Sequence, residues 1–381
     1  MEEINMVDLK GQYERIKSGV DNAVQSVIDS AAFIRGPEVK KFEEELASYL
    51  RVKHVIGCAN GTDALQVALM ALNAEPGDEV ICTDFTFIAS AEVIALLGLK
   101  PVFTDPEPDT FNISPAAIEK AIGPRTKAIM PVHLFGQPAD MEAILDIAHR
   151  HKLFVLEDAA QATGADYIFP DGTRKKAGTM GDVGCTSFFP SKNLGCYGDG
   201  GAIFTNNDHL ASLMRSITNH GSSKKYYHDH TGVNSRLDSI QAAILRVKLP
   251  FLDEYNNARR NAASFYDSRL SHTAGLTIPL RSDKSSHIFH QYTIKTEPAL
   301  RDELKKFLAQ KNIPSMVYYP VPMHRQKAYS HLVPADSNFP LSENLCRSVL
   351  SLPMHTELTI KQLQYISDAV CSFLEKNTDH E

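Results

Sequence analysis

What this 381-residue sequence lacks already narrows its class. Its lysines and arginines form no long cluster and the formal net charge is −7, which argues against nucleic acid as a partner. No apolar run is long enough to span a bilayer, and the first residues, "MEEINMVDLK", contain no apolar signal-peptide core. We therefore expect a cytoplasmic protein without a membrane partner.

Paired cysteines are also missing. The six cysteines form no CxxC motif and no zinc-like spacing with histidine, so we expect reduced thiols, no disulfide framework and no metal site. We find no internal repeat and no low-complexity segment. The cysteines are Cys58, Cys82, Cys185, Cys196, Cys346 and Cys371.

The sequence instead alternates apolar, strand-like segments with helical ones. After a helix expected over residues 38–50, strands are expected at 54–59, 79–83, 100–105, 128–134, 153–158, 185–189 and 202–206. Helices are expected between them at 64–72, 89–97, 115–122, 141–151 and 208–219. This alternation predicts an α/β fold with a mostly parallel sheet covered by helices, whose ligands bind beyond the carboxyl ends of the strands.

The chain is longer than most chains that fold around a single hydrophobic core, so we expect two domains. From about residue 235 a long helical stretch begins, interrupted at Pro250. Beyond it, short strands at 290–296 and 314–320 mix with helices. We place the boundary inside the long helix, giving a large domain over 1–250 and a smaller α+β domain over 251–381.

The turn "ANGTDAL" joins the first expected strand to a helix and is a candidate phosphate site. Gly61 allows close backbone approach, Thr62 offers a hydroxyl, and the start of the helix offers free N–H groups. The alternative is an ordinary helix cap made by Thr62 or Asp63.

A second candidate is the apolar strand in "FVLEDAAQATGA", which ends in Glu157 and Asp158. A carboxylate at the mouth of a sheet is costly unless it is paired, and a protonated pyridine nitrogen is one suitable partner. The alternative is an aspartate that caps a helix.

Lys192 stands at the end of an apolar strand, just before the glycine-rich "GCYGDGG". Burial there lowers the pKa of an amine, and a neutral amine forms a Schiff base with an aldehyde. The alternatives are a surface lysine or a nucleotide loop, although the glycines match neither GxGxxG nor GxxxxGK[ST]. Phe87, which begins a helix, is a candidate cover for a planar ring or an ordinary core residue.

Together, a phosphate cradle, a carboxylate for a ring nitrogen, an aromatic ring and an amine for an aldehyde are the four requirements of pyridoxal 5′-phosphate. The stretches "GPEVKKFEEELASYL", "ANGTDAL", "DEVICTDFTFIASAEVI", "PRTKAIMPVHLFGQPADM", "LEDAAQA", "SFFPSKNLGCYGDGGAI" and "GVNSRLDSIQAAIL" closely resemble the DegT/DnrJ/EryC1/StrS family of nucleotide-sugar aminotransferases. The resemblance covers nearly the whole chain. It implies a fold-type I aminotransferase architecture and a homodimer that shares its active sites.

The resemblance also implies residue roles at the cofactor. Lys192 would form the Schiff base and then act as general base and acid, and Asp158 would pair with the ring nitrogen. Gln161 would lie near the ring hydroxyl and Phe87 over the ring face. Because position 192 is lysine and not the histidine of the family's dehydratases, transamination is favoured.

On the phosphate side, the resemblance places Thr62, beside Gly61, together with Ser187. Asn234, in "GVNSRLD", resembles the residue that reaches the phosphate of the neighbouring subunit's cofactor. A monomer is therefore expected to be inactive.

Within the family, the motifs of this sequence most resemble the branch that aminates carbon 3 of UDP-2-acetamido-2-deoxy-3-ketoglucuronate with L-glutamate. That branch makes diaminosugars for a surface polysaccharide such as O-antigen. Arg236 is a candidate for the sugar carboxylate, or alternatively forms an ion pair with Asp238 or another acid. The segment "YYPVPMHRQKAY" offers Tyr319, His324 and Arg325 as further substrate contacts.

Three other functions are kept as alternatives. The first is an aminotransferase for a 4-keto-6-deoxy nucleotide sugar, which would leave Arg236 without a carboxylate to bind. The second is a catalytically silent regulatory protein of the same fold, although no helix-turn-helix segment flanks it. The third is an NAD-dependent oxidoreductase, which would need a glycine fingerprint where "NGTDAL" stands. His133 and His220 are expected to be structural or peripheral.

Overall fold

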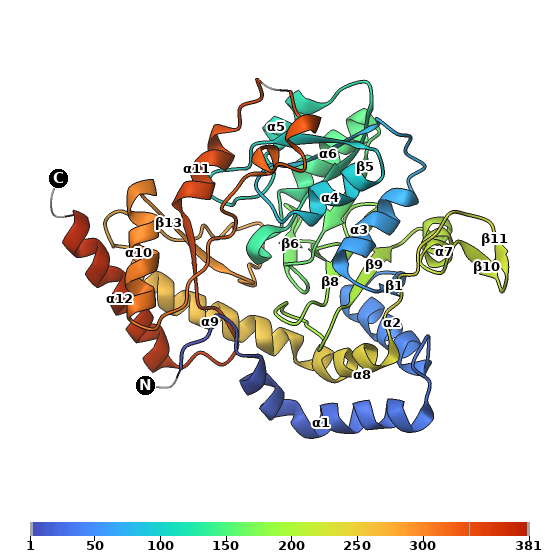
Figure 1. The fold of residues 1–381 in the computed structure, drawn as a ribbon, viewed down its shortest axis with the longest axis horizontal. Helices are drawn as coiled ribbons and strands as arrows, with labels where there is room; N and C mark the ends of the chain where they lie inside the picture. Colours follow the sequence, from blue (N-terminus) through green and yellow to red (C-terminus); the bar gives the residue numbers. More distant parts are fainter. Residues whose placement is uncertain (1–2, 335, 379–381) are drawn as a thin grey trace.

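A seven-stranded mixed sheet organises the first half of the chain in the computed structural model, which describes residues 3–334 and 336–378 (Figure 1). The strand order is β1-β9-β8-β5-β4-β2-β3, and β9 is antiparallel to both of its neighbours while the other pairs are parallel. The strands are β1 (His54–Cys58), β2 (Glu79–Thr83), β3 (Lys100–Thr104), β4 (Thr126–Met130), β5 (Phe154–Asp158), β8 (Val183–Ser187) and β9 (Gly201–Thr205). The predicted α/β fold with a mostly parallel sheet is confirmed.

Helices cover both faces of this sheet. Side chains alternate along each strand, so in β2 Val80 and Cys82 belong to the core on one face and Ile81 to the core on the other. The first face packs against α3 (Gly61–Met70), α4 (Ala89–Leu96) and α7 (Asp208–Ile217). The second packs against α2 (Pro37–Leu50), α5 (Pro115–Ala121), α6 (Met141–His151) and α8 (Ser239–Lys248).

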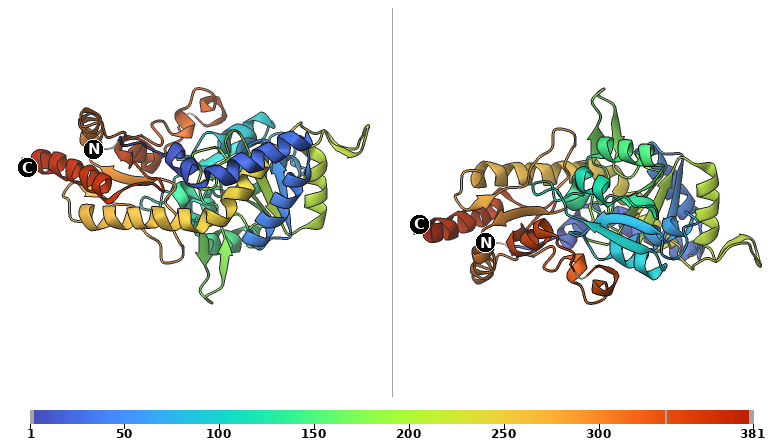
Figure 2. Two further views of the ribbon diagram at one scale, coloured as in Figure 1. Left: turned by 90° about the horizontal axis from the view of Figure 1, so that it is seen from below. Right: turned by 90° about the horizontal axis from the view of Figure 1, so that it is seen from above.

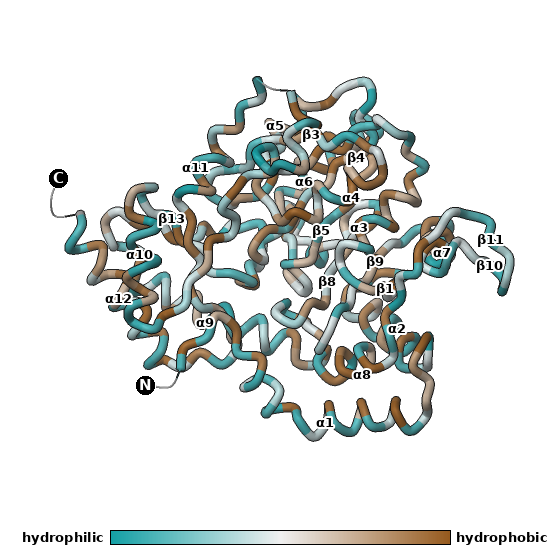
Figure 3. The backbone as a smooth tube through the Cα atoms, viewed as in Figure 1, coloured by the Kyte–Doolittle hydropathy of each residue, from teal (hydrophilic) through white to brown (hydrophobic). Residues whose placement is uncertain are grey.

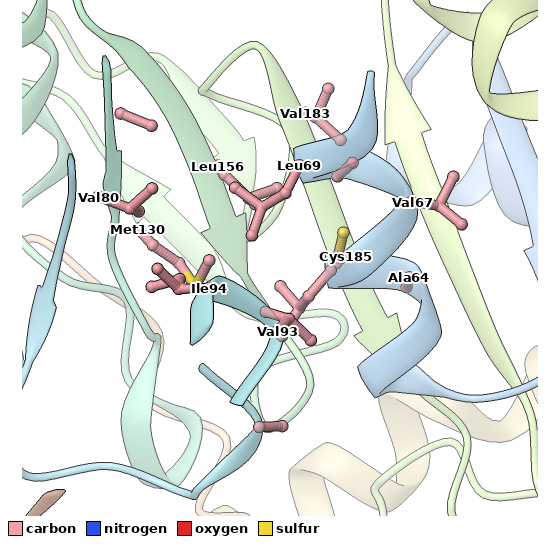
Figure 4. Close-up of a cluster of buried hydrophobic side chains, with 14 of the residues drawn as sticks. Ala64, Val67, Leu69, Val80, Val93, Ile94, Met130, Leu156, Val183 and Cys185 are labelled. Carbon is pink, nitrogen blue, oxygen red and sulfur yellow. The ribbon is translucent and has the colours of Figure 1, made fainter. Parts of the chain in front are cut away.

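The core on the first face fixes how α3 enters the site. Figure 4 shows Ala64, Val67 and Leu69 of α3 on the helix that packs over the strands of the sheet. The strands below contribute buried residues such as Leu156 and Cys185. This packing anchors α3 immediately after it leaves the carboxyl end of β1.

The second half of the chain has its own core and a three-stranded antiparallel sheet, β12 (Leu276–Thr277), β13 (Tyr292–Thr296) and β14 (Val349–Leu352). Around it lie α9 (Leu252–Leu270), α10 (Pro298–Gln310), α11 (Pro340–Ser348) and α12 (Ile360–Thr378). The strand predicted over 290–296 is confirmed as β13. The strand predicted over 314–320 is wrong, because that segment forms only an isolated bridge between Met316 and Ser351.

The long helix predicted across residue 250 is broken where expected. Helices α8 and α9 are separated by the 3-10 turn Leu249–Phe251, which contains Pro250. Proline lacks the N–H that a continuous helix needs and crowds the preceding turn. The domain boundary that we place in this region stays a prediction, and the extreme ends of the two ranges, residues 1–2 and 379–381, lie outside the described residues.

Besides strands β12 and β14 of the smaller sheet, one helix and two hairpins were not predicted. Helix α1 (Leu9–Ser30) packs along α8, below the rest of the molecule in Figure 1. Two hairpins, β6 (Asp166–Ile168) with β7 (Arg174–Lys176) and β10 (Ser222–Lys224) with β11 (Tyr227–His228), project from the body in Figure 2. Figure 3 colours the β10–β11 hairpin mostly hydrophilic, so it carries little of the apolar alternation that reveals a strand.

In the described part of the chain, no helix combines the length and the apolar character that crossing a membrane requires.

Beneath the site, a fully buried glutamate ties β5 to the chain that precedes β8. The Glu157 carboxylate accepts hydrogen bonds from the backbone N–H groups of Gly178, Met180 and Gly181, at 2.9, 2.6 and 2.6 Å. It also lies 2.8 Å from Nε2 of His133, whose Nδ1 accepts a hydrogen bond from the Ala139 backbone. Both ring nitrogens of His133 therefore serve the fold.

Glu157→Ala should lower the free energy of unfolding of the apoprotein by about 3 kcal/mol or more, because it leaves three buried N–H groups and a histidine without a partner. The measurement is denaturant unfolding followed by circular dichroism. Glu44→Ala is the matched control, since Glu44 is exposed and its ion pair with Lys40 is 3.8 Å long. Equal loss in the two variants would contradict this account of Glu157.

Candidate active site

The predicted site residues of the sheet meet at the carboxyl ends of β1, β5 and β8. In the sheet register Gly201 lies opposite both Cys58 and Ser187, and Asp158 lies opposite Cys185. These pairings bring Ser187, Asp158 and the turn after Cys58 to one edge of the sheet. This edge is where a largely parallel sheet binds its ligand.

The turn from β1 into α3 is packed too tightly for side chains at two positions. A Cβ atom at Gly61 would lie 2.6 Å from Cβ of Ser187, and one at Gly201 would lie 2.4 Å from the carbonyl carbon of Asn60. The cap of α3 is Asn60, whose side chain accepts the Asp63 N–H at 2.8 Å, so the alternative of a cap made by Thr62 or Asp63 is wrong.

This geometry places Thr62 and Ser187 where they can face a ligand, although the Ser187 oxygen also accepts the Phe189 N–H at 3.2 Å and only its O–H is left to donate. The first N–H groups of a helix have no acceptor within the helix and attract an anion. With the backbone of Gly61 lying directly against Ser187, both hydroxyls border the start of α3. The arrangement fits a phosphate group.

Asp158 is a buried carboxylate with little to neutralise it. Its side chain is 6% exposed and accepts hydrogen bonds only from the Ala160 backbone at 3.1 Å and the Ser90 hydroxyl at 3.3 Å, among the described residues. Burial raises the pKa of this carboxyl group, and the hydrogen bond from Ala160 and the charge of Lys192 oppose the shift. A cation bound at its open side would relieve the cost of burial.

Lys192 lies in the loop that joins β8 to β9. The loop folds back on itself through hydrogen bonds from the Lys192 N–H to the Phe189 carbonyl and from the Cys196 N–H to the Phe188 carbonyl, both 2.8 Å. Burial lowers the pKa of the Lys192 amine to about 8, and the charge of Asp158 partly opposes this. The amine is therefore a far better nucleophile at neutral pH than a solvated lysine.

Gln161 links the cofactor side of the site to the predicted substrate segment. Its Oε1 accepts the Phe135 N–H at 2.8 Å, and its Nε2 donates to the Tyr319 hydroxyl at 3.0 Å. Phe87 lies with its ring centroid 6.1 Å from that of Tyr319 and is 52% exposed. The structure thus brings Gln161, Tyr319 and Phe87 together and leaves the Phe87 side chain exposed.

His324 and Arg325 are engaged within the chain. The His324 Nδ1 lies 2.7 Å from Asp84, and its Nε2 lies 3.3 Å from Glu343. Arg325 forms an ion pair with the same Glu343 at 2.8 Å. Their assignment as substrate contacts stays a prediction, and substrate would have to compete with these carboxylates.

Asn234 and Arg236 lie on the segment between the β10–β11 hairpin and α8. Asn234 is exposed, and its backbone bridges to Asn219. Asp238 caps α8 by accepting the Gln241 N–H at 2.8 Å, and Arg236 forms no ion pair within the described residues. The alternative that Arg236 pairs with Asp238 is therefore wrong.

Two residues of the site were missed. Ser90 donates to Asp158, and its spacing of three from Phe87 near the start of a helix could have revealed it. His290 is buried, and burial together with the charge of Lys192 holds its pKa well below the usual range of histidine. No sequence signal distinguished His290 from the other residues of its strand-like segment.

These residues fit pyridoxal 5′-phosphate on chemical grounds. A buried carboxylate without an ion pair, a poorly solvated amine, free helix N–H groups beside two hydroxyls and an exposed aromatic ring match its ring nitrogen, aldehyde, phosphate and ring. The part of the chain that is described contains no group of three or more side chains placed to hold a metal ion. Fold and site together define a fold-type I pyridoxal-phosphate enzyme.

The chain belongs to the DegT/DnrJ/EryC1/StrS aminotransferase family, which it matches over residues 14–371. It is a nucleotide-sugar aminotransferase that depends on pyridoxal phosphate.

Similar proteins match nearly end to end. A "pleiotropic regulatory protein" of Geobacillus stearothermophilus is 49% identical, covering 97% of this chain and 98% of its own. The UDP-2-acetamido-2-deoxy-3-oxo-D-glucuronate aminotransferase of Pseudomonas aeruginosa is 44% identical, covering 96% and 99%. The crystal structure of S. venezuelae DesV, solved in complex with a ketimine intermediate, has a TM-score of 0.94 at 41% identity, covering 98% and 99%.

The reactivity of Lys192 tests the site without bound cofactor. Because only the neutral amine reacts, trace acetylation of Lys192 in the apoprotein should reach half its maximum near pH 8, where free Nα-acetyl-lysine requires a pH above 10. The measurement is peptide mass spectrometry across that range. Asp158→Asn should move the midpoint lower, since the Asp158 charge raises the Lys192 pKa. A midpoint near that of the free amino acid would contradict the burial of this amine.

Proposed function

We propose that this enzyme transfers the amino group of L-glutamate to carbon 3 of UDP-2-acetamido-2-deoxy-3-ketoglucuronate, in making a diaminosugar for a surface polysaccharide such as O-antigen. The observation that carries the proposal is Arg236, a half-buried guanidinium that lines a cavity and has no ion pair among the described residues. A guanidinium binds a carboxylate through two parallel hydrogen bonds, and this sugar carries one. The Pseudomonas aeruginosa relative, named for this substrate, supports the proposal.

Each residue of the candidate site has its own role in the proposed reaction. When bound, the cofactor supplies an aldehyde and a ring that accepts electrons. The Lys192 amine would hold the cofactor through its aldehyde and would serve as the general base and acid of the site. Asp158 would keep the ring nitrogen protonated, and Gln161 and Phe87 would orient the ring. Thr62 and Ser187 would hold the phosphate.

A regulatory function is the second candidate, because the Geobacillus relative carries that name. A silent regulator, however, has no need of a lysine with a lowered pKa beside a buried, unneutralised aspartate. A 4-keto-6-deoxy sugar would give Arg236 no carboxylate to bind. We therefore favour the acidic sugar.

The two half-reactions test the proposal. Protein loaded with pyridoxal 5′-phosphate should lose its visible absorbance when L-glutamate is added, because the cofactor becomes aminated. The aminated enzyme should then aminate the 3-ketoglucuronate nucleotide, and with a lower KM than the matching ketosugar without a carboxylate. Mass spectrometry of the sugar is the readout.

Two variants control this experiment. Arg236→Gln should raise the KM of the acidic sugar about tenfold and leave the glutamate reaction intact. Lys192→Ala should abolish turnover. If glutamate does not change the visible absorbance, L-glutamate is not the amino donor. If both sugars have equal KM values, the acidic sugar is not the preferred substrate. A protein that never binds the cofactor would favour the regulatory function.

We further propose that the active enzyme is a homodimer in which Asn234 serves the cofactor phosphate of the neighbouring subunit. The exposed side chain of Asn234 and the projecting β10–β11 hairpin just before it support this assignment. Tyr226 and Tyr227 of that hairpin are 82% and 62% exposed. Because a lone two-stranded hairpin is only marginally stable, a neighbouring subunit that covers these side chains would stabilise it.

Complementation tests the shared site. Lys192→Ala and Asn234→Ala should each be nearly inactive, but coexpression should restore about a quarter of the sites, because in a mixed dimer one site has both residues. Activity in the separated mixed dimer, assayed as glutamate-dependent amination, is the measurement. If Asn234 served its own chain, neither site of the mixed dimer would be complete and no activity would return.

A further inference from the structure

A buried asparagine on α9, Asn256, contacts the residue next to Lys192. The Asn256 Oδ1 accepts a hydrogen bond from Nδ2 of Asn193 at 2.7 Å. Asn193 is also buried, and it follows Lys192 directly in the loop between β8 and β9. Helix α9 therefore holds this loop at the position beside the reactive amine.

The other end of the Asn256 amide binds the segment that follows Asp158. Its Nδ2 donates to the backbone carbonyl of Thr163 at 3.4 Å. The Thr163 hydroxyl in turn lies 2.6 Å from the hydroxyl of Thr186 on β8, so this segment is fixed to the sheet as well. A single side chain thus joins the loop of Lys192 to the segment of Asp158.

Gly164 leaves room for this contact. Its φ is +93°, a conformation that favours glycine, and a Cβ atom there would lie 2.7 Å from Nδ2 of Asn256. The backbone therefore approaches the Asn256 amide more closely than a side chain at position 164 would permit.

Arg259, three residues after Asn256 on the same helix, fixes α9 to the chain around β13. Its buried Nη1 donates to three backbone carbonyls, those of Phe289, His290 and Met354, at 3.3, 3.3 and 2.9 Å. The carbonyl of Ile288 accepts a second hydrogen bond from Nδ2 of Asn193 at 3.2 Å. Asn193 is thus held by Asn256 and by the backbone segment that Arg259 binds.

The pair of amides is not satisfied completely. The Asn193 Oδ1 is buried and has no hydrogen-bond partner among the residues that the structure describes, whereas its Nδ2 makes two hydrogen bonds. A buried amide oxygen without a partner is costly, so stability alone does not account for an asparagine here. What the two hydrogen bonds do achieve is a fixed place for the residue after Lys192.

We propose that Asn256 is a positioning residue of the active site, whose amide sets the place of the Lys192 loop relative to Asp158. The amine and the carboxylate must meet the same bound molecule, and a small misplacement of reacting groups lowers a rate strongly. The inference rests on the roles of Lys192 and Asp158 in the proposed function, because Asn256 acts through these two residues.

The reactivity of Lys192 in the apoprotein tests the proposal without cofactor. Asn256→Ala should raise the pH of half-maximal trace acetylation from near 8 by about one pH unit, because a released loop lets water reach the amine. Tyr266→Phe is the matched control, since Tyr266 is buried on the same helix and its hydroxyl donates to the Pro353 carbonyl at 3.0 Å. The control should lower the melting temperature and leave the Lys192 midpoint unchanged.

The glutamate reaction of the enzyme loaded with pyridoxal 5′-phosphate gives a second readout. In Asn256→Ala its maximal rate should fall about tenfold, because a positioning residue acts in the transition state. The glutamate concentration that gives half this rate should change less than about twofold. Tyr266→Phe should retain both values.

A double-mutant cycle tests whether the two amides act as a pair. Asn193→Ala removes the other side of the same contact, so the double variant should lose less in rate than the product of the two single losses. Losses that multiply in full would show independent roles and would overturn the proposal.

Melting temperatures verify that each variant is folded. An unchanged Lys192 midpoint or an unchanged maximal rate in folded Asn256→Ala would overturn the proposal. If Asn256→Ala does not fold, Asn193→Ala is judged by the same two readouts.

Failure of the proposed function looks different. In that case the wild-type enzyme does not react with glutamate, while the Lys192 midpoint still shifts between the wild-type apoprotein and Asn256→Ala. If the wild-type enzyme reacts normally and neither readout changes in the variant, only the role of Asn256 fails.

Discussion

The carboxylate of Asp158, buried at the end of β5, is the constraint on which the rest of the site depends. Its charge lies in a region of low polarity with one backbone N–H and one hydroxyl to stabilise it. The nearby Lys192 amine is also poorly solvated. Burial therefore disfavours both the negative charge of Asp158 and the positive charge of Lys192. A cofactor that brings a cationic ring nitrogen and an aldehyde relieves both at once. The same two side chains, Asp158 and Lys192, therefore serve both cofactor binding and the chemistry.

Much of this arrangement could be predicted from the sequence, because it depends on local patterns. Apolar strands alternating with helices predict the parallel sheet, and strand ends place Asp158, Ser187 and the turn at Gly61 at one edge. The break at Pro250 follows from the chemistry of proline alone. These features need no knowledge of which distant segments meet.

The rest depends on tertiary contacts that no local pattern contains. Tyr319 meets Gln161 across 158 positions of sequence, and His324 meets Asp84 across 240. The segment 314–320 has the apolar alternation of a strand but meets the free edge of β14 only at the bridge between Met316 and Ser351. The β10–β11 hairpin is too short and too polar to leave a strand signal.

The projecting hairpin has a thermodynamic consequence for the free chain. Two short strands that stand away from the body bury little surface, so most of the free energy that orders them has to come from whatever surface covers them (Figure 2). In the proposed homodimer, ordering of the hairpin and association of the chains would be linked equilibria, and each would shift the other by the same free energy. A substitution that stiffens residues 222–228 would strengthen association without adding a single contact to the partner.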